Sequence, residues 1–248
     1  MKLRLTLAAA LLAAPAAALA AGAAALYEYK PDIGNSASVQ RGAAAFMNYC
    51  SGCHSLRFLR YGRLAEDHAI PVDLLQENLM FTSDKPGEHI LSAMPADSAA
   101  QWFGQAPPDL TLSARARGAD WIYSFLKSFY LDPSKANGVN NKQLPGASMP
   151  HVLGGLEGYK VVGHAEDGQD DAHHGGGHAP QWEQVEAGSL SAKEYDSFVS
   201  DLTNFLAYAA EPGAAKMHSR GLWVLFYLVF LLIPLTWLIK KEFWKDVH

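Results

Sequence analysis

Two cysteines and a histidine lie close together in the pentapeptide Cys50-Ser51-Gly52-Cys53-His54. Two thiols at this spacing can each form a thioether to one edge of a porphyrin, and the adjoining imidazole can then bind the iron. The pattern therefore predicts one covalently attached haem c, held by Cys50 and Cys53, with His54 as an iron ligand. A haem of this kind indicates electron transfer as the chemistry of the chain.

The same cysteines allow other interpretations that the sequence weighs against. They are the only two cysteines in the chain, which excludes a four-cysteine zinc site and a disulfide framework. A thioredoxin-like dithiol remains possible, but it would leave His54 without a role. An export signal in the same chain favours haem attachment, because the signal and the pentapeptide together are much rarer than either alone.

The N-terminus has the features of that export signal. Lys2 and Arg4 precede an apolar, alanine-rich run, and Ala18-Leu19-Ala20 supplies a small-x-small cleavage pattern. Residues 1–20 are therefore predicted to be a secretory signal peptide. Between residues 5 and 39 the only basic residue is Lys30, so the arginine-rich character of a mitochondrial transit peptide is missing and a bacterial periplasm fits better.

A membrane anchor is predicted near the other end of the chain. Residues 221–239 carry no charge, and at 1.5 Å per residue they are long enough to cross a hydrocarbon layer of roughly 30 Å. Trp223 and Trp237 lie towards the two edges, as in an aromatic belt, which favours a membrane span over a buried helix of a soluble core. Pro234 is expected to kink the helix without ending it.

The anchor fixes the expected orientation. Lys240, Lys241 and Lys245 follow it directly, and the positive-inside rule places the tail, residues 240–248, in the cytoplasm. Residues 21–220 then form a single haem domain in the periplasm, held at the inner (cytoplasmic) membrane by one span. We expect no contact with nucleic acid.

The expected periplasmic domain is acidic. The whole chain has a formal net charge of −5, and residues 21–220 contain 15 basic and 23 acidic residues, a net charge of −8. Such a surface can steer a basic soluble protein towards it, an effect that weakens with salt. Ordinary solubility explains the same charge equally well.

Apolar residues at helical spacing predict several helices in this domain. They lie over residues 38–50, ending at the pentapeptide, 71–80, 120–131, and 191–211, where Ser191 and Glu194 form a capping-box pattern. No convincing alternation of apolar and polar residues indicates a strand. The prediction is a mainly α haem domain with long loops, plus one C-terminal transmembrane helix.

Two segments fall outside this helical pattern. Residues 137–163 are rich in glycine and proline, which predicts a long loop of the kind that wraps a ligand. Residues 164–178 are a tract of histidine, glycine and acidic residues. Histidine-rich tracts can bind metal, although this composition more often forms a flexible surface loop.

The second axial ligand decides what the haem does. An open position permits small-ligand chemistry, whereas histidine–methionine ligation saturates the iron and suits an electron carrier. Met94 lies between an apolar run that looks like a helix end and a new helix start, so a core role would also explain it. Met149 lies in the loop 137–163, which can lay its thioether over a haem face. This context favours Met149 only slightly, and weaker candidates are His68, His89 and His151.

Several motifs in one order carry a family resemblance. They are C-S-G-C-H at 50–54, Ala106-Pro107-Pro108-Asp109-Leu110, Arg115-Ala116-Arg117 followed by Asp120, a late Met-Pro, Ala209-Ala210-Glu211-Pro212, and a single C-terminal span with an internal proline. From about Tyr27 to the C-terminus, this combination resembles the cytochrome c1 family, the haem subunits of cytochrome bc1 complexes. The resemblance implies that Cys50 and Cys53 carry the thioethers and that His54 and Met149 are the two iron ligands.

Further site residues are implied by the same resemblance. Arg117 matches the family arginine near a haem propionate, a carboxylate that guanidinium can hold bidentately, although a surface charge at a helix start would also explain it. Pro107 and Pro108 match a rigid turn beside the haem edge. Trp121 stands where the family commonly has tyrosine, so a hydroxyl hydrogen bond at this position is not carried over.

The resemblance also implies partners and a function. The chain would take single electrons from a Rieske iron-sulfur protein and pass them to a soluble or tethered cytochrome c. It would do so beside cytochrome b in a dimeric quinol–cytochrome c reductase, without making or breaking bonds itself. The rival class is a membrane-anchored haem enzyme or sensor with an open axial position, such as a peroxidase, in which a spare histidine could act as the acid or base.

Overall fold

The structure is a computed structural model that describes residues 25–163 and 180–245. Its elements are α2 (Ser36–Tyr49), β1 (Leu56–Arg60), α3 (Tyr61–His68), α4 (Val72–Leu79), β2 (His89–Ile90), α5 (Ala96–Phe103), α6 (Ser113–Arg117), α7 (Ala119–Lys127), β3 (Phe129–Leu131), β4 (Val139–Asn141), α8 (Gly154–Glu157), β5 (Gly158–Val162), β6 (Trp182–Ala187), α9 (Ala192–Ala210), α10 (Ala214–Tyr227), the π-helical turn η1 (Leu228–Leu232) and α11 (Ile233–Glu242). The predicted signal peptide and the histidine-rich tract lie outside the described residues.

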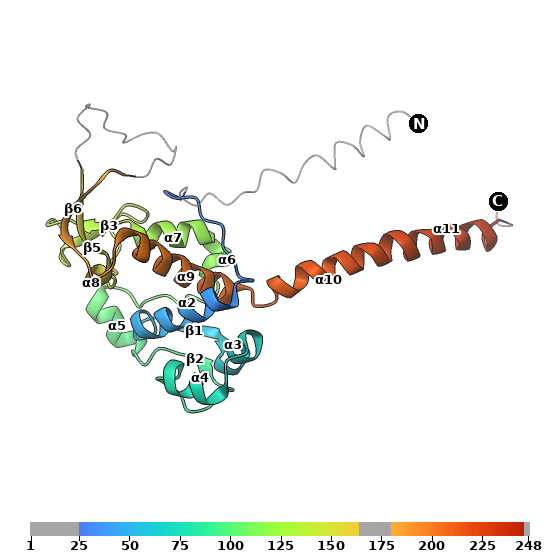
Figure 1. The fold of residues 1–248 in the computed structure, drawn as a ribbon, viewed down its shortest axis with the longest axis horizontal. Coiled ribbons are helices and arrows are strands. Elements are labelled where there is room, and N and C mark those ends of the chain that lie inside the picture. The colour runs from blue at the N-terminus through green and yellow to red at the C-terminus, as the bar shows by residue number, and fades with distance from the viewer. Residues whose placement is uncertain (1–24, 164–179, 246–248) are drawn as a thin grey trace.

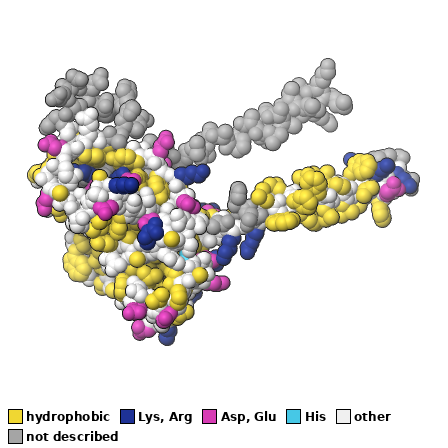
Figure 2. Space-filling model, in the orientation of Figure 1, with side chains coloured by type: hydrophobic (Ala, Val, Ile, Leu, Met, Phe, Trp, Pro, Cys, Tyr) yellow, Lys and Arg dark blue, Asp and Glu magenta, His cyan; other side chains and the backbone are white. Residues whose placement is uncertain are grey.

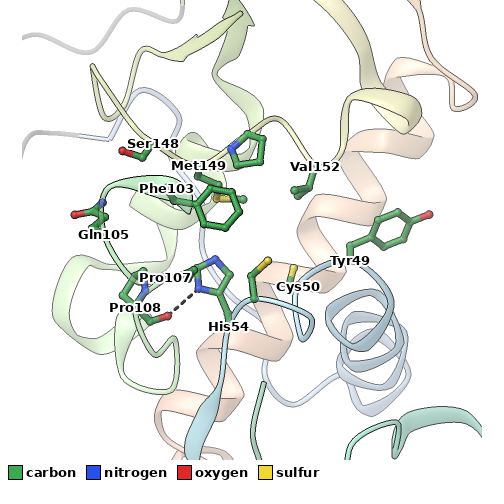
Figure 3. A pocket seen from close by; sticks show the side chains of 12 residues that line it. Tyr49, Cys50, His54, Phe103, Gln105, Pro107, Pro108, Ser148, Met149 and Val152 are labelled. Atoms are coloured by element: carbon green, nitrogen blue, oxygen red, sulfur yellow. Dashed lines mark hydrogen bonds between the residues drawn. The ribbon is translucent and has the colours of Figure 1, made fainter. Parts of the chain in front are cut away.

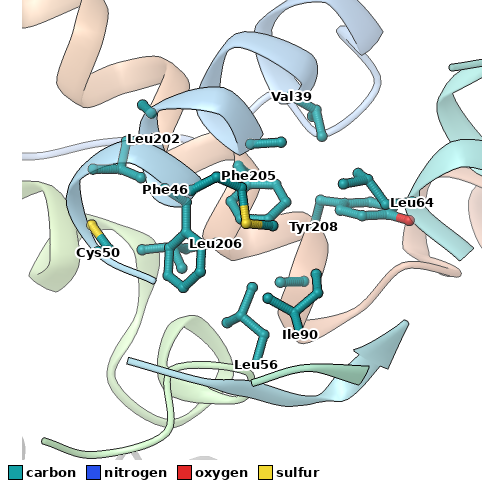
Figure 4. Packing of buried hydrophobic residues seen from close by; sticks show 14 of the residues in the cluster. Val39, Phe46, Cys50, Leu56, Leu64, Ile90, Leu202, Phe205, Leu206 and Tyr208 are labelled. Carbon is teal, nitrogen blue, oxygen red and sulfur yellow. The ribbon is translucent and has the colours of Figure 1, made fainter. Parts of the chain in front are cut away.

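The core is built on the packing of α2 against α9 (Figure 1). Phe46 and Phe205 are fully buried where the two helices meet, with ring centroids 5.5 Å apart (Figure 4). At Gly42 the helices come so close that an added Cβ would lie 2.0 Å from the carbonyl oxygen of Asp201. The Asp201 carboxylate also accepts hydrogen bonds from Arg41 and Ser38, so polar contacts reinforce the apolar packing at this place.

The helices predicted at the two ends of the domain are confirmed. Helix α9 begins with the expected capping box: Ser191 Oγ accepts from the Glu194 N–H, and the Glu194 carboxylate accepts from the Ser191 N–H at 2.9 Å. This exchange satisfies two N–H groups that a helix start leaves without partners. Helix α2 ends at Tyr49, with Cys50 as its C-cap, so it delivers the pentapeptide as predicted.

The prediction of a mainly α domain with one C-terminal apolar helix is confirmed, and short strands that the sequence did not indicate accompany the helices. The described residues include three short antiparallel pairs, β1–β2, β3–β4 and β5–β6. The longest of these strands, β6, reads W-E-Q-V-E-A, which does not alternate strictly between apolar and polar residues and so lacks the usual signal of a strand. The predicted helix over 120–131 also ends early, at Lys127, because Phe129 to Leu131 pair with Asn141 to Val139 as strand β3.

The segment 137–163 is more ordered than its composition predicts. It contains β4, α8 and β5, and the longest stretch without helix or strand is its middle, residues 142–153. The context expected for Met94 also differs, because Ile90 belongs to strand β2 rather than to a helix end. The new helix start after Met94 is present, and Pro95 is the N-cap of α5.

The C-terminal helix extends away from the domain (Figure 1). Residues Arg220–Glu242 form one apolar helix of 23 residues that is not buried by the rest of the chain and is long enough to cross a membrane. Apolar side chains cover it, and lysines gather at its far end (Figure 2). Pro234 lacks an N–H and would clash with a carbonyl one turn earlier, and η1 widens the helix immediately before it, so the helix continues through the proline.

Candidate functional site

A cavity opens at the C-terminal end of α2 (Figure 3). It consists of two adjoining hollows that share a set of lining residues and hold about 570 and 990 Å³ of atom-free space, counting solvent at the mouth. The shared residues are Cys50, His54, Gln105, Pro108, Ser148 and Met149. Most of the exposed lining surface is apolar, as expected of a site for a largely apolar cofactor.

The pentapeptide forms a tight turn that places its chemistry at this cavity. The N–H groups of Cys53 and His54 both donate to the Cys50 carbonyl, at 3.0 and 2.8 Å. Both cysteines and His54 therefore line the same hollow. Burial raises the pKa of the Cys50 thiol to about 12, the opposite of the lowered pKa that a thioredoxin-like dithiol needs.

The orientation of His54 is set by Pro108. Nδ1 of His54 lies 2.8 Å from the Pro108 carbonyl oxygen (Figure 3). A carbonyl can only accept a hydrogen bond, so Nδ1 carries the proton and Nε2 keeps a free lone pair, the form that ligates a metal. Burial also lowers the pKa of His54, which favours the neutral ring. Pro107 and Pro108 both line the hollow, and their fixed φ angles stiffen the segment that supplies this carbonyl.

Met149 lies across the cavity from His54 (Figure 3). The chain around it follows the cavity wall, since Ser148, Pro150 and Val152 line the same hollow. Met94 lines neither hollow. The tertiary structure thus brings Met149, and not Met94, to the predicted haem ligand His54.

The weaker histidine candidates also lie away from both hollows. His68 packs edge-on against Tyr208, with ring centroids 4.4 Å apart. His151 stacks on Phe129 at 4.9 Å. His89 belongs to strand β2.

Arg117 and Trp121 form part of the wall of the larger hollow. The guanidinium carbon of Arg117 lies 4.3 Å from the centre of the Trp121 ring, and that ring stacks on Phe125 at 5.3 Å. Arg117 has no acidic side chain within ion-pair distance among the described residues. Its charge is therefore available for a carboxylate of a bound group.

Sequence reasoning did not identify several lining residues. They include Phe103 at the end of α5, Gln105 just after it, Leu144 close before Met149 in the chain, and Leu202 and Leu206 on α9. The two α9 leucines belong to the apolar stripe that predicted that helix, but nothing in their spacing distinguishes a residue that faces a cofactor from one that faces the core.

The donor set fits a c-type haem. The cavity is lined by two thiols, an imidazole with a free nitrogen and an opposing thioether. Its walls are mostly apolar and include Arg117, which has no ion-pair partner among the described residues. These groups suit the vinyl edge, the iron and a propionate of a c-type haem. A bound haem supplies a one-electron iron couple. The protein's part is to hold it rigidly, orient its ligands and exclude water from its faces.

This fold and site define a c-type cytochrome with a C-terminal apolar helix that could span a membrane. Comparison with known proteins gives its family. A family model described as the Cytochrome C1 family matches residues 32–170. Cytochrome c1 of Allochromatium vinosum is 49% identical over 99% of both chains, and cytochrome c1 of Rhodospirillum rubrum is 29% identical over 84% of this chain and 81% of its own. The chain belongs to the cytochrome c1 family and is a haem electron carrier.

One similar protein has a different name. The gamma subunit of ammonia monooxygenase of Nitrosomonas europaea is 38% identical to this chain over 96% of both sequences.

Proposed function

We propose that this chain takes single electrons from a Rieske iron-sulfur protein and passes them to a cytochrome c-type acceptor, as a subunit of a quinol–cytochrome c reductase. The observation that carries the proposal is the placing of His54 and Met149 on opposite walls of one apolar cavity, with Cys50 and Cys53 at its edge (Figure 3). Two protein ligands leave the iron no open position, which suits electron carriage rather than small-ligand chemistry.

In this proposal each residue has a separate task. Cys50 and Cys53 hold one haem by thioethers. His54, held in the required tautomer by Pro108, and Met149 would ligate its iron. Arg117 would hold a propionate, and Pro107 and Pro108 would form a stiff wall beside the bound haem.

The proposed topology follows from the two chain ends. Residues 1–20 are removed as a signal peptide, residues 21–220 form the haem domain in the periplasm, residues 221–239 cross the inner membrane, and residues 240–248 lie in the cytoplasm. The apolar helix Arg220–Glu242 supports the single anchor, and Lys240 and Lys241 at its end support the orientation. The anchor would hold the haem domain beside cytochrome b in a dimeric complex.

A carbon monoxide assay tests the proposal against an open-site haem enzyme. The purified native complex is reduced, and its absorption spectrum is recorded before and after addition of the gas. Without an open iron position, we expect the carbon monoxide spectrum to match the reduced one. Ready binding by the undamaged protein would refute the assignment of two protein ligands and favour the peroxidase-like alternative.

A second experiment tests the partners. The membrane complex is purified through a tag on this chain in its native host, and the co-purifying chains are identified by mass spectrometry. We expect cytochrome b and a Rieske protein in equal amounts with this chain. Recovery of monooxygenase subunits in their place would contradict the proposed complex and give weight to the similarity with the Nitrosomonas protein.

A further inference from the structure

The segment that carries Met149 has two sides. Ser148, Met149, Pro150 and Val152 line the cavity, whereas His151 lines neither hollow. The His151 side chain is only 4% exposed. It is therefore packed into the protein behind the segment, on the side away from the candidate haem site.

The His151 ring belongs to a row of aromatic rings, here called the aromatic column, that runs from His151 through Phe129 and Phe125 to Trp121. The ring stacks on Phe129 with centroids 4.9 Å apart and an interplanar angle of 9°, and the edge of Tyr159 closes another side at 6.0 Å. Phe129 in turn contacts Phe125 at 5.1 Å, and Phe125 stacks on Trp121. Because Phe125 and Trp121 line the larger hollow, the column joins the back of the Met149 segment to the cavity wall.

The buried side chain of Glu157 faces the polar side of the same ring. Nε2 of His151 lies 3.0 Å from Oε2 of Glu157, a close contact without the alignment of a hydrogen bond. Neither these two atoms nor Nδ1 of His151 has a hydrogen-bond partner among the described residues. Lys160 donates to the other carboxylate oxygen of Glu157 and, at 2.7 Å, to the carbonyl of Lys127. All three side chains, His151, Glu157 and Lys160, are at least 90% buried, so this cluster fixes the ring to β5 and to the end of α7.

The segment is attached to the rest of the domain towards its two ends, where the Gly146 N–H donates to Asn140 Oδ1 at 2.8 Å and Leu153 is buried in the core. Residues 142–153 contain neither helix nor strand. The backbone bonds near Met149 are local ones, from the Val152 N–H to the Pro150 carbonyl and from the Gly154 N–H to the His151 carbonyl. Contacts this short in sequence shape the turn but do not attach it to the rest of the domain.

We propose that His151 is a positioning residue that holds Met149 in place as an iron ligand, through its stack on Phe129 and its contact with Glu157. This inference rests on the proposed function, since it takes Met149 to be the axial ligand. His151 itself touches neither the cavity nor the bound group. It acts through the main chain of Pro150, which alone separates it from Met149 in the sequence.

The physical consequence of removing His151 follows from what it leaves behind. In His151→Ala a ring-sized void opens beside Phe129, and Glu157 loses the group that faces one of its oxygens. The segment then gains freedom to move, and the thioether–iron bond is broken for a larger fraction of the time. A tenfold rise in that fraction needs only about 1.4 kcal/mol, which is small beside the usual effect of such a loss.

The experiment compares four variants in the full chain, assembled in its membrane complex with haem attached. His151→Ala removes the anchor, and Glu157→Gln weakens it while leaving the aromatic stack intact. Met149→Leu is the reference for complete loss of the ligand. His68→Ala is the matched control, because His68 is also a buried histidine packed against an aromatic ring but lies away from the cavity.

Three readouts are measured for each variant: the midpoint potential, the methionine-to-ferric-iron charge-transfer band, and the fraction of reduced haem that binds carbon monoxide. We expect His151→Ala to lower the potential, weaken the band and raise the carbon monoxide-binding fraction about tenfold. Glu157→Gln should change all three readouts in the same direction but by less. If the His151→Ala protein does not accumulate, Glu157→Gln still tests the positioning role of His151. His68→Ala should lower the melting temperature but leave the three readouts at their wild-type values.

The possible failures are distinguishable. If Met149→Leu leaves the potential and the band unchanged, the ligand assignment in the proposed function is wrong. If Met149→Leu changes them but His151→Ala and Glu157→Gln do not, or if His68→Ala changes them equally, the positioning role is refuted while the ligand assignment stands.

Discussion

The crossing of α2 and α9 predicts a large effect for the smallest possible substitution. In Gly42→Ala the new Cβ would lie 2.0 Å from the Asp201 carbonyl oxygen, whereas ordinary contacts begin near 3.4 Å. The helices must therefore separate by roughly 1.4 Å, because the clashing atom belongs to the backbone and no rotamer can remove it. We expect a loss of about 3 kcal/mol in the free energy of unfolding, at the upper end for overpacking.

The assay is thermal unfolding of the purified full chain with haem attached. A loss of this size lowers the melting temperature by about 6–12 °C in a domain of this length. Because Cys50 is the C-cap of α2, we also expect less covalently attached haem per chain in Gly42→Ala. The matched control is Gly87→Ala, since an added Cβ there meets nothing within 4 Å. If the two variants melt at the same temperature, the close helix crossing does not limit the fold and the reasoning is refuted.

Three further predictions concern ligation, docking and acid stability. Met149→Leu should sharply lower the midpoint potential in a redox titration while haem stays covalently attached, and Met94→Leu should not; the reverse pattern would overturn the ligand choice. Reduction of a basic cytochrome c, followed by stopped flow, should slow steeply as salt rises if the net charge of −8 over residues 21–220 steers docking, and a flat response would leave that charge as a matter of solubility. Burial acts to raise the pKa of Asp67, but hydrogen bonds from Arg63 and Lys216 outweigh it, and the pKa lies below its ordinary value of 3.8. The ionised, bonded carboxylate therefore contributes stability above pH 3.8 that is lost as the pH falls through the lower, folded-state pKa, and acid titration of Asp67→Asn should show a smaller loss over that range.

The features that depend on local chemistry could be predicted from the sequence. The C-x-x-C-H spacing, the capping box of Ser191 and Glu194, and the uncharged run of the C-terminal helix each act within a few turns of chain. The interactions behind them are local in sequence, since thioether spacing, helix capping and hydropathy need no partner far away in the chain. For the same reason, the predicted boundaries of α9 agree with the structure to within a residue or so.

The features that depend on partners far away in the chain could not be predicted from the sequence. Phe129 continues the helical pattern of α7, yet it lies in a strand because Asn141 supplies a pairing partner that local spacing does not reveal. The sequence context separated Met149 from Met94 only weakly, and the choice rests on which segment the fold brings across from His54. His151 shows the same limit: a ligand candidate by residue type, it is turned away from the cavity by Phe129 and Glu157. Sequence alone thus predicted the cofactor's attachment and the anchor, whereas tertiary packing decided which side chains face the cavity, because that depends on contacts between segments far apart in the chain.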